Sequence, residues 1–305
     1  MRSPCSIERV ESELICLASL ELHCHSLTSE KLKRRVEPPY GIGWVAGATE
    51  RRVDPTKTSL SGSILRYHRD GHENRFPERV FLDVMAGPGI CKIKDSGEEL
   101  AGSPLIAMKH DFTKFVFIES DPKLAAALEK RIALQPKANL STVLRRDWTK
   151  EVAEGRLTFP KGLVVAFVDP TGIKQAPWQA MKQLLMNNSK IDILATLQYA
   201  MGITLNVYQY LDSGSEHTTA LDSFLGERDW RSWPREATDA TFTTRVINRW
   251  VEKLGALGFQ GSRQITVEAN GSPLYRLALF SRHPKADEFW RKIITMDESG
   301  QRQLL

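Results

Sequence analysis

Apolar residues in the middle of the chain form short, nearly continuous runs that alternate with segments of helical spacing. The runs are RVFLDV, KFVFIE, STVL, GLVVAFV and KIDILATL, all between residues 79 and 197. The intervening PKLAAALEKRIALQ and APWQAMKQLLMNN place apolar residues three and four positions apart, as amphipathic helices do. Strands without polar alternation are buried on both faces, so the pattern predicts a parallel sheet covered by helices.

The last part of the chain departs from this alternation. A long helix is predicted over residues 241–259, followed by two strand-like segments, SRQITVEA and LYRLALFSRH, which are joined through NGSP. Asn-Gly is a strong hairpin signal, so these two strands should be antiparallel. A mostly parallel α/β sheet that ends in an antiparallel hairpin is the outline of the three-layer, Rossmann-like fold of class I S-adenosylmethionine (SAM) methyltransferases. A nicotinamide-dependent oxidoreductase, the alternative, would continue with parallel strands.

We expect three segments along the chain: a helical or loosely ordered extension over residues 1–57, the α/β domain over 58–293 with an inserted lid at 202–234, and a tail over 294–305. The extension contains His23-Cys24-His25 near Cys16, which resembles part of a zinc site. No second ligand pair follows at metal-site spacing, so we interpret this stretch as a solvated turn and expect no metal. The basic run at residues 31–35 is interpreted as a solvated face.

Composition and hydropathy argue against a membrane-spanning protein and against a disulfide-rich secreted protein. Lysine and arginine outnumber aspartate and glutamate by 42 to 37, a mild excess that is compatible with nucleic acid but ordinary for an enzyme. The sequence shows no apolar stretch of membrane-spanning length and no signal-peptide pattern at its start. Four cysteines, three of them within the first 24 residues, do not suggest a disulfide framework. These features predict a cytoplasmic protein with no membrane partner.

Four predicted strands end in acids, and in such sheets ligands bind beyond the carboxyl ends of the strands. The acids are Asp83, Glu119, Asp147 and Asp169. Asp83 precedes a turn with Gly87 and Gly89, and we expect it to fix the turn's amides and the cationic end of a ligand while the glycines make room. Glu119 is placed to accept ribose hydroxyls, and Asp147 to reach an adenine amino group. Taken alone, Asp147 is better explained as a helix cap or a surface residue.

The glycine turn favours SAM over a dinucleotide as the cofactor. Gly-Pro-Gly lacks the third glycine of the dinucleotide motif, and residues 90–101 interrupt the helix that should receive a pyrophosphate. The predicted cofactor-binding set is therefore Asp83, Gly87, Gly89, Glu119 and Asp147.

Five blocks, FLDVMAGPG, GSPLIA, FIESDP, FVDPTGIKQAPW and LYRLALFSRHPKADEFW, occur in this order. Together they resemble the three-Cys-motif partner (TcmP) family, bacterial proteins with a methyltransferase-like fold, and the resemblance runs from about Thr56 to Ile293. The cysteines in the family name belong to the other protein, so the resemblance implies a three-Cys-motif protein as partner. Two positions depart from the family: Thr171 replaces an aromatic residue after Asp-Pro, and His68 lies in a poorer version of the N-terminal helix block.

Two functions follow from these residues. The first is methyl transfer from SAM to an unidentified acceptor, with Asp169 as the candidate catalytic residue. Its Asp-Pro-Thr-Gly turn is similar to the turn with which amino-methyltransferases hold an amino group. A flipped base would need an aromatic face from Trp178, Trp230 or Trp233, for which core packing is the favoured interpretation. The alternative is a non-catalytic SAM-binding scaffold for the three-Cys-motif protein, which is similar to radical-SAM enzymes in its cysteine pattern.

Overall fold

A computed structural model describes residues 76–92, 99–197, 203–211, 216–233, 238–261, 264–269, 272–284 and 286. The predictions for residues 1–57 and for the tail 294–305 lie outside the described residues. The histidines and cysteine considered for zinc therefore lie outside them too.

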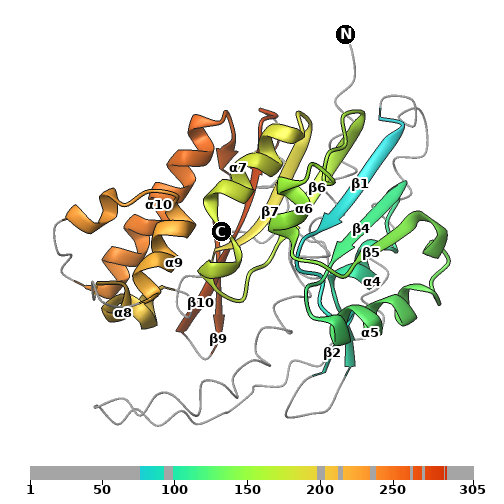
Figure 1. Ribbon diagram of the computed structural model, residues 1–305, viewed down its shortest axis with the longest axis horizontal. Helices are drawn as coiled ribbons and strands as arrows, with labels where there is room; N and C mark the ends of the chain where they lie inside the picture. The colour runs from blue at the N-terminus through green and yellow to red at the C-terminus, as the bar shows by residue number, and fades with distance from the viewer. Residues whose placement is uncertain are drawn as a thin grey trace, which may run out of the picture.

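Five parallel strands form the main part of the central sheet (Figure 1). In spatial order they are β5 (Ser141–Leu144), β4 (Lys114–Ile118), β1 (Glu78–Asp83), β6 (Gly162–Val168) and β7 (Ile191–Leu197). The register places Asp83 between Phe117 of β4 and Phe167 of β6. The chain thus builds the sheet outward from β1 to β5 and then returns to the other side of β1. Ligands of open α/β sheets bind at such a switch point.

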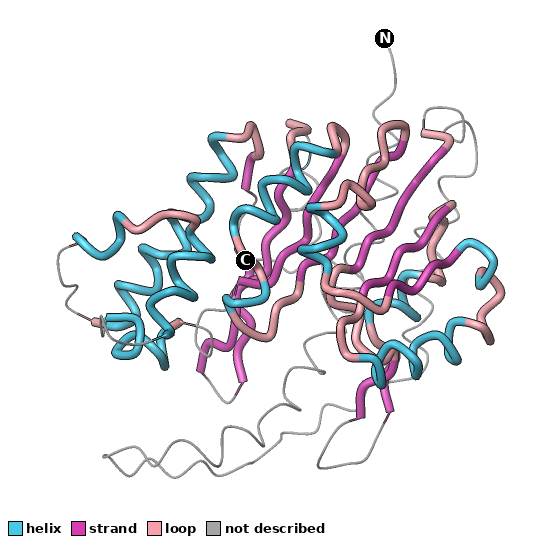
Figure 2. The backbone as a smooth tube through the Cα atoms, in the orientation of Figure 1, coloured by secondary structure: helices cyan, strands magenta, loops and turns pink. Residues whose placement is uncertain are grey.

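The remaining strands are antiparallel. β10 (Ser272–Ser281) pairs with β7 in the antiparallel sense, and both β9 (Ile265–Ala269) and the short β8 (Gln260–Gly261) pair with β10. The predicted hairpin is therefore confirmed, although its turn residues 270–271 lie outside the described ones. Figure 2 shows the strands side by side with helices around them. This order is that of the class I methyltransferase-like fold, and the parallel continuation of the nicotinamide alternative is not found among the described strands.

Both faces of the sheet are buried, as the apolar runs predicted. On β1, Val80 belongs to one hydrophobic cluster and its neighbour Phe81 to the other. On β10, Phe280 faces the first cluster and Leu279 the second. Every residue of the central strand β6 is buried. The alternation of side chains across the strands thus fills two cores with one sheet.

Helices cover the two faces. The first cluster receives α6 (Trp148–Ala153), α7 (Trp178–Asn187), α9 (Glu216–Leu225) and α10 (Asp239–Ala256), and the second receives α4 (Ser103–Ala107) and α5 (Pro122–Ile132). Local sequence explains where α5 starts. Asp121 Oδ1 accepts hydrogen bonds from the amides of Lys123 and Leu124, at 2.7 and 3.1 Å, and Pro122 occupies the first helical position. None of the helices in the described residues combines the length and hydropathy of a membrane span.

Two insertions interrupt the alternation of strands and helices. An antiparallel pair, β2 (Ile90–Lys92) and β3 (Glu99–Ala101), separates the glycine turn from α4, where an interruption was predicted. Between β7 and α10 lie the 3-10 turn η5 (Thr204–Asn206), α8 (Val207–Leu211), α9 and the 3-10 turn η6 (Asp229–Ser232). α9 packs against α7 and against η4 (Ile173–Gln175), the turn that follows β6. The expectation that residues 202–234 form a lid stays a prediction.

Candidate ligand site at the carboxyl edge of the sheet

Asp83 is the last residue of β1 and has no exposed surface. Its Oδ1 accepts a hydrogen bond from the Met85 amide at 3.2 Å, and its Oδ2 accepts one from the Ser103 hydroxyl at 2.6 Å. Ser103 is buried and is the first residue of α4. Asp83 therefore connects the start of the glycine turn to the start of the helix beyond the β2–β3 insertion.

The surroundings of Asp83 favour its protonated form. Burial raises the pKa of the Asp83 carboxyl, the carboxylates of Asp169 and Glu119 raise it to a smaller extent, and the resulting pKa is about 7 instead of 3.8. The hydrogen bonds from Ser103 and Met85 lower the pKa but do not offset burial. A positive charge placed close to this carboxyl would favour the anion.

The turn after β1 contains two glycines with positive φ, which other residues adopt only with strain. Gly87 has φ 61° and Gly89 has φ 79°. A Cβ at Gly89 would lie 2.8 Å from Leu128 Cδ1 of α5, so packing within the protein explains that glycine. A Cβ at Gly87 would meet no described atom within 4 Å. Of the two glycines predicted to make room for a ligand, Gly87 is the one with open space beside it.

Glu119 follows β4 directly and holds two turns together. Its Oε2 accepts a hydrogen bond from the Gly87 amide at 2.9 Å, and its Oε1 accepts one from the Asp121 amide at 2.8 Å. Each carboxylate oxygen has two lone pairs, so both oxygens can accept a further hydrogen bond from a ribose hydroxyl. Glu119 therefore shapes the glycine turn, and its carboxylate keeps acceptor capacity for a further donor.

Asp147 does not end a strand, which corrects the prediction. β5 ends at Leu144, and Asp147 is the N-cap of α6, where its Oδ1 accepts hydrogen bonds from the Thr149 amide at 2.8 Å and hydroxyl at 2.7 Å. An aspartate in this position stabilises a helix start. Asp147 is exposed, and no described residue donates to its Oδ2. The cap interpretation is correct, and one oxygen still faces outward.

Asp169 follows β6 directly and is half-buried. Its Oδ1 accepts a hydrogen bond from the Thr196 hydroxyl of β7. Beyond Pro170, the Thr171 amide and hydroxyl both donate to Gln175 Oε1, at 2.7 and 3.0 Å. The Gln175 amide in turn donates to the Gly172 carbonyl at 3.0 Å. Residues 171–175 thus form a turn that is closed on itself beside Asp169.

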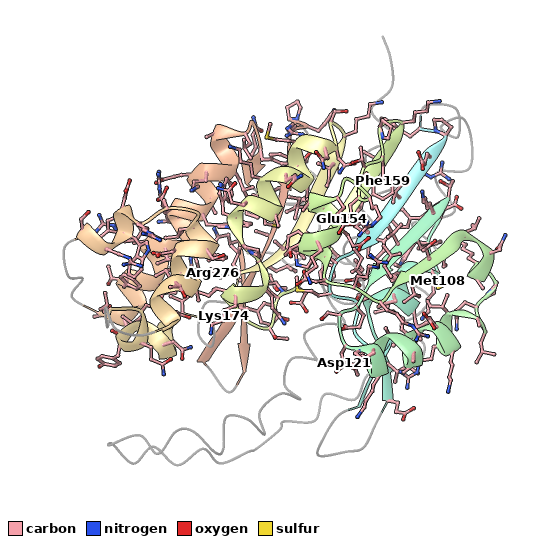
Figure 3. All side chains as sticks on the ribbon, in the orientation of Figure 1. Met108, Asp121, Glu154, Phe159, Lys174 and Arg276 are labelled. Carbon is pink, nitrogen blue, oxygen red and sulfur yellow. The ribbon has the colours of Figure 1, made fainter. Side chains whose placement is uncertain are left out.

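The structure brings the predicted acids to one edge of the sheet. Asp83, Glu119 and Asp169 are close enough for the second and third to raise the pKa of the first, and Asp147 follows the edge strand β5 as the N-cap of α6. Figure 3 labels Asp121 and Lys174, which follow β4 and β6, well below Phe159, which precedes β6. The carboxyl edge therefore faces the lower part of that view.

The tryptophans considered for base stacking belong mainly to the core. Trp178 is 5% exposed and Trp230 is 2% exposed, and both lie in the first hydrophobic cluster. Trp233 is partly buried against the same cluster, with the Arg245 guanidinium 4.6 Å from its ring centre. Core packing is confirmed for the two buried rings.

Four further residues complete the site and were not foreseen: Ser103, Trp148, Gln175 and Thr196. Thr196 is a polar residue in an apolar strand, a signal that sequence reasoning could have used. Ser103 lies in the GSPLIA block but had no assigned role. The other two act through a contact that no local pattern reveals, the hydrogen bond from Trp148 Nε1 to the Gln175 carbonyl at 2.9 Å.

Outside this edge of the sheet, we examined a surface hollow and possible metal ligands. A surface hollow of about 540 Å³ lies between α10 and η6, and its lining does not include Asp83, Glu119, Asp147 or Asp169. The Arg249 guanidinium on its wall is paired with Glu227 and Glu252. In the part of the chain that the structure describes, no group of three or more histidine, cysteine or acidic residues could hold a metal ion.

Comparisons with known proteins assign this chain to no family. No protein-family model matches the chain, and no curated protein matches it. Among solved structures, a Legionella pneumophila protein aligns with TM-score 0.42 and 12% identity, covering 81% of this chain and 91% of that one. The magnesium protoporphyrin IX methyltransferase of Synechocystis with bound SAH aligns at 0.39 and 12%, covering 75% and 82%. A cofactor-bound protein from MTB aligns at 0.41 and 11%, covering 78% and 84%. Because these TM-scores are all below 0.5, the fold assignment rests on the order and direction of the strands.

Proposed function

We propose that this chain binds SAM at the carboxyl edge of β1, β4 and β6 and transfers its methyl group to an acceptor. One observation carries the proposal. At the switch point of the sheet, the Glu119 carboxylate bonds to the amide of Gly87, the glycine with open space beside it. A carboxylate that could accept from ribose hydroxyls and an open glycine turn therefore meet at the place where such sheets bind nucleosides.

Each part of the cofactor has a matching group. Ribose hydroxyls would bind Glu119, and an adenine amino group would donate to the outward Oδ2 of Asp147. The sulfonium and ammonium charges would lie near Asp83 and Asp169, where carboxyls repel one another and a cation relieves that repulsion. This arrangement explains why a buried acid lies directly under the glycine turn.

The acceptor would lie against the Asp169 turn. When bound, SAM would supply an electrophilic methyl carbon to a lone pair of the acceptor, and its sulfur would leave as a thioether. Asp169 would orient the acceptor, with its carboxylate held by Thr196. Proximity and alignment supply most of the rate in such a transfer. The acceptor half of the site is thus built on the turn at residues 169–175.

The resemblance to three-Cys-motif partner proteins suggests that the chain works with a partner protein, and nucleic acid is compatible with its basic excess. A scaffold without turnover is the alternative function. Incubation with methyl-labelled SAM and a cell extract, with and without the three-Cys-motif protein, separates the two. We expect labelling by the wild type and none by Asp169→Ala, which should still bind SAM. An unlabelled extract under both conditions supports the scaffold, and equal labelling by the variant removes Asp169 from the mechanism.

Binding itself is tested at Glu119 with paired ligands. Glu119→Ala should weaken adenosine binding roughly 10- to 150-fold, the loss expected for about 1.5–3 kcal/mol of hydrogen bonding to a charged group. Calorimetry with 2′,3′-dideoxyadenosine, which lacks the hydroxyls, should show little difference between variant and wild type. Glu129→Ala, which removes a surface partner of Arg145, is the control. Equal losses with both nucleosides would mean that Glu119 acts through the turn alone.

A further inference from the structure

A hydrogen bond joins the loop after β5 to the turn after β6. Trp148 directly follows Asp147 and is 4% exposed, and its Nε1 donates to the Gln175 carbonyl at 2.9 Å. The two residues are 27 positions apart in the sequence. The first residue of α6 is therefore tied to the last residue of η4, across the carboxyl edge of the sheet.

Hydrogen bonds connect the residues of the turn at this contact to one another. Gln175 accepts two hydrogen bonds from Thr171 through its side chain, and its amide donates to Gly172. Trp148 holds one end of this turn, and α9 packs against η4. Trp148 is therefore in direct contact with the residues that follow Asp169.

Asp147 and Trp148 are neighbours in the chain at the start of α6. Asp147 is the N-cap of α6 and Trp148 is the first helical residue, and the bonds to Thr149 fix their relative geometry. A ligand bound to the free Oδ2 of Asp147 would restrict the helix start. The indole would then be restricted with it.

We propose that Trp148 is a positioning residue that couples the nucleoside side of the site to the acceptor turn, so that a nucleoside bound at Asp147 orders residues 171–176. This inference rests on the proposed function, because it assumes that SAM binds at this edge. It assigns a role in the site to a tryptophan that touches neither the cofactor nor the acceptor. SAM binding would in this way prepare the acceptor turn before the acceptor arrives.

Hydrogen exchange of the full-length protein, with and without SAM, tests the coupling. Trp148→Phe keeps an aromatic ring and removes the N–H donor. Trp250→Phe is a matched control, because Trp250 is 2% exposed and its Nε1 has no partner among the described atoms. In the wild type and in the control, SAM should protect both residues 84–89 and residues 171–176. In Trp148→Phe, the increase in protection of residues 171–176 that SAM causes should be about three- to tenfold smaller than in the wild type, the factor expected for one neutral hydrogen bond.

The outcomes separate the inference from the proposed function. If SAM increases the protection of residues 171–176 equally in Trp148→Phe and in the wild type, the inference is overturned. It is also overturned if SAM protects only residues 84–89 of the wild type. A wild type with no protection anywhere removes the proposed function as well. Should Trp148→Phe fail to fold, exchange of the Trp148 indole N–H in wild-type protein gives the same answer: SAM should slow it, and an unchanged rate contradicts the coupling.

Discussion

Replacing Asp83 by Asn should stabilise the free protein while weakening its binding of SAM. Asn has nearly the same shape, and its amide can accept from Met85 and donate to the Ser103 hydroxyl. The substitution therefore removes the charge and keeps the two contacts. A residue that serves folding alone would not show opposite effects on stability and binding.

The magnitude follows from the raised pKa of Asp83. One pKa unit corresponds to about 1.4 kcal/mol, so a rise from 3.8 to about 7 gives an upper limit of roughly 4 kcal/mol. Between pH 3.8 and 7 the folded protein holds a proton that the unfolded chain has lost. The contribution of protonated Asp83 to the stability of the folded protein is therefore complete below pH 3.8 and disappears as the pH rises through 7. Asp83→Asn should remove this fall in stability, with its largest gain above pH 7.

Denaturant unfolding of wild type and variant from pH 5 to 8.5, with SAM titrations at pH 8, measures both effects. Asp192→Asn is the matched control, because burial also raises the pKa of Asp192, to about 6, and this residue lies near the start of β7, at the other edge of the sheet. The control should gain stability and bind SAM normally. If Asp83→Asn is destabilised above pH 7, or if it binds SAM as the wild type does, the reasoning about Asp83 is wrong.

Three further changes have defined outcomes. Gly87→Ala and Gly155→Ala share a positive φ, 61° and 74°, and open space at Cβ. Calorimetry and unfolding should therefore show similar stability losses of about 1 kcal/mol, with SAM binding lost at Gly87 alone; equal binding would mean that no ligand lies beside Gly87. Burial lowers the pKa of His110 to about 4, and neither ring nitrogen has a partner among described atoms. Wild-type stability should therefore fall as the pH drops from 6.5 to 4, and His110→Leu should flatten that fall in acid unfolding curves, whereas an unchanged profile would place a partner at the ring. Arg282 donates to the carbonyls of Leu185 and Leu257, both at 3.2 Å, and stacks on Phe259. Arg282→Met should cost about 2 kcal/mol by denaturant unfolding, and a neutral result would show that water replaces these bonds.

The fold was predictable because its signals are local and strong. Buried parallel strands appear as unbroken apolar runs, and Asn-Gly marks the hairpin of β9 and β10. The insertion at residues 90–101 was visible as a break in the helix expected after the glycine turn. Helix starts such as Asp121-Pro122 follow from residues that are neighbours in the sequence.

The site was predictable only in outline. Acids at strand ends could be placed at one edge, but their partners depend on contacts between segments far apart. Glu119 bonds to an amide 32 residues away, so its role in holding the glycine turn could not be inferred from local pattern. A Cβ at Gly89 would lie against Leu128 of α5, a contact that the local sequence does not reveal, and the ligand role of Gly89 stays a prediction. Asp147 was placed on a strand because Arg145 and Arg146 do not break an extended pattern as a proline or glycine would.

Calorimetric titration of the full-length protein with SAM, and separately with NAD, tests the central claim most directly. The account predicts one SAM bound per chain, competition by adenosine and no heat from NAD, because the glycine turn and the interrupted helix do not suit a pyrophosphate. Absence of SAM binding at millimolar concentration, or binding that Glu119→Ala and Gly87→Ala leave unchanged, would contradict the placement of a SAM site at this edge of the sheet.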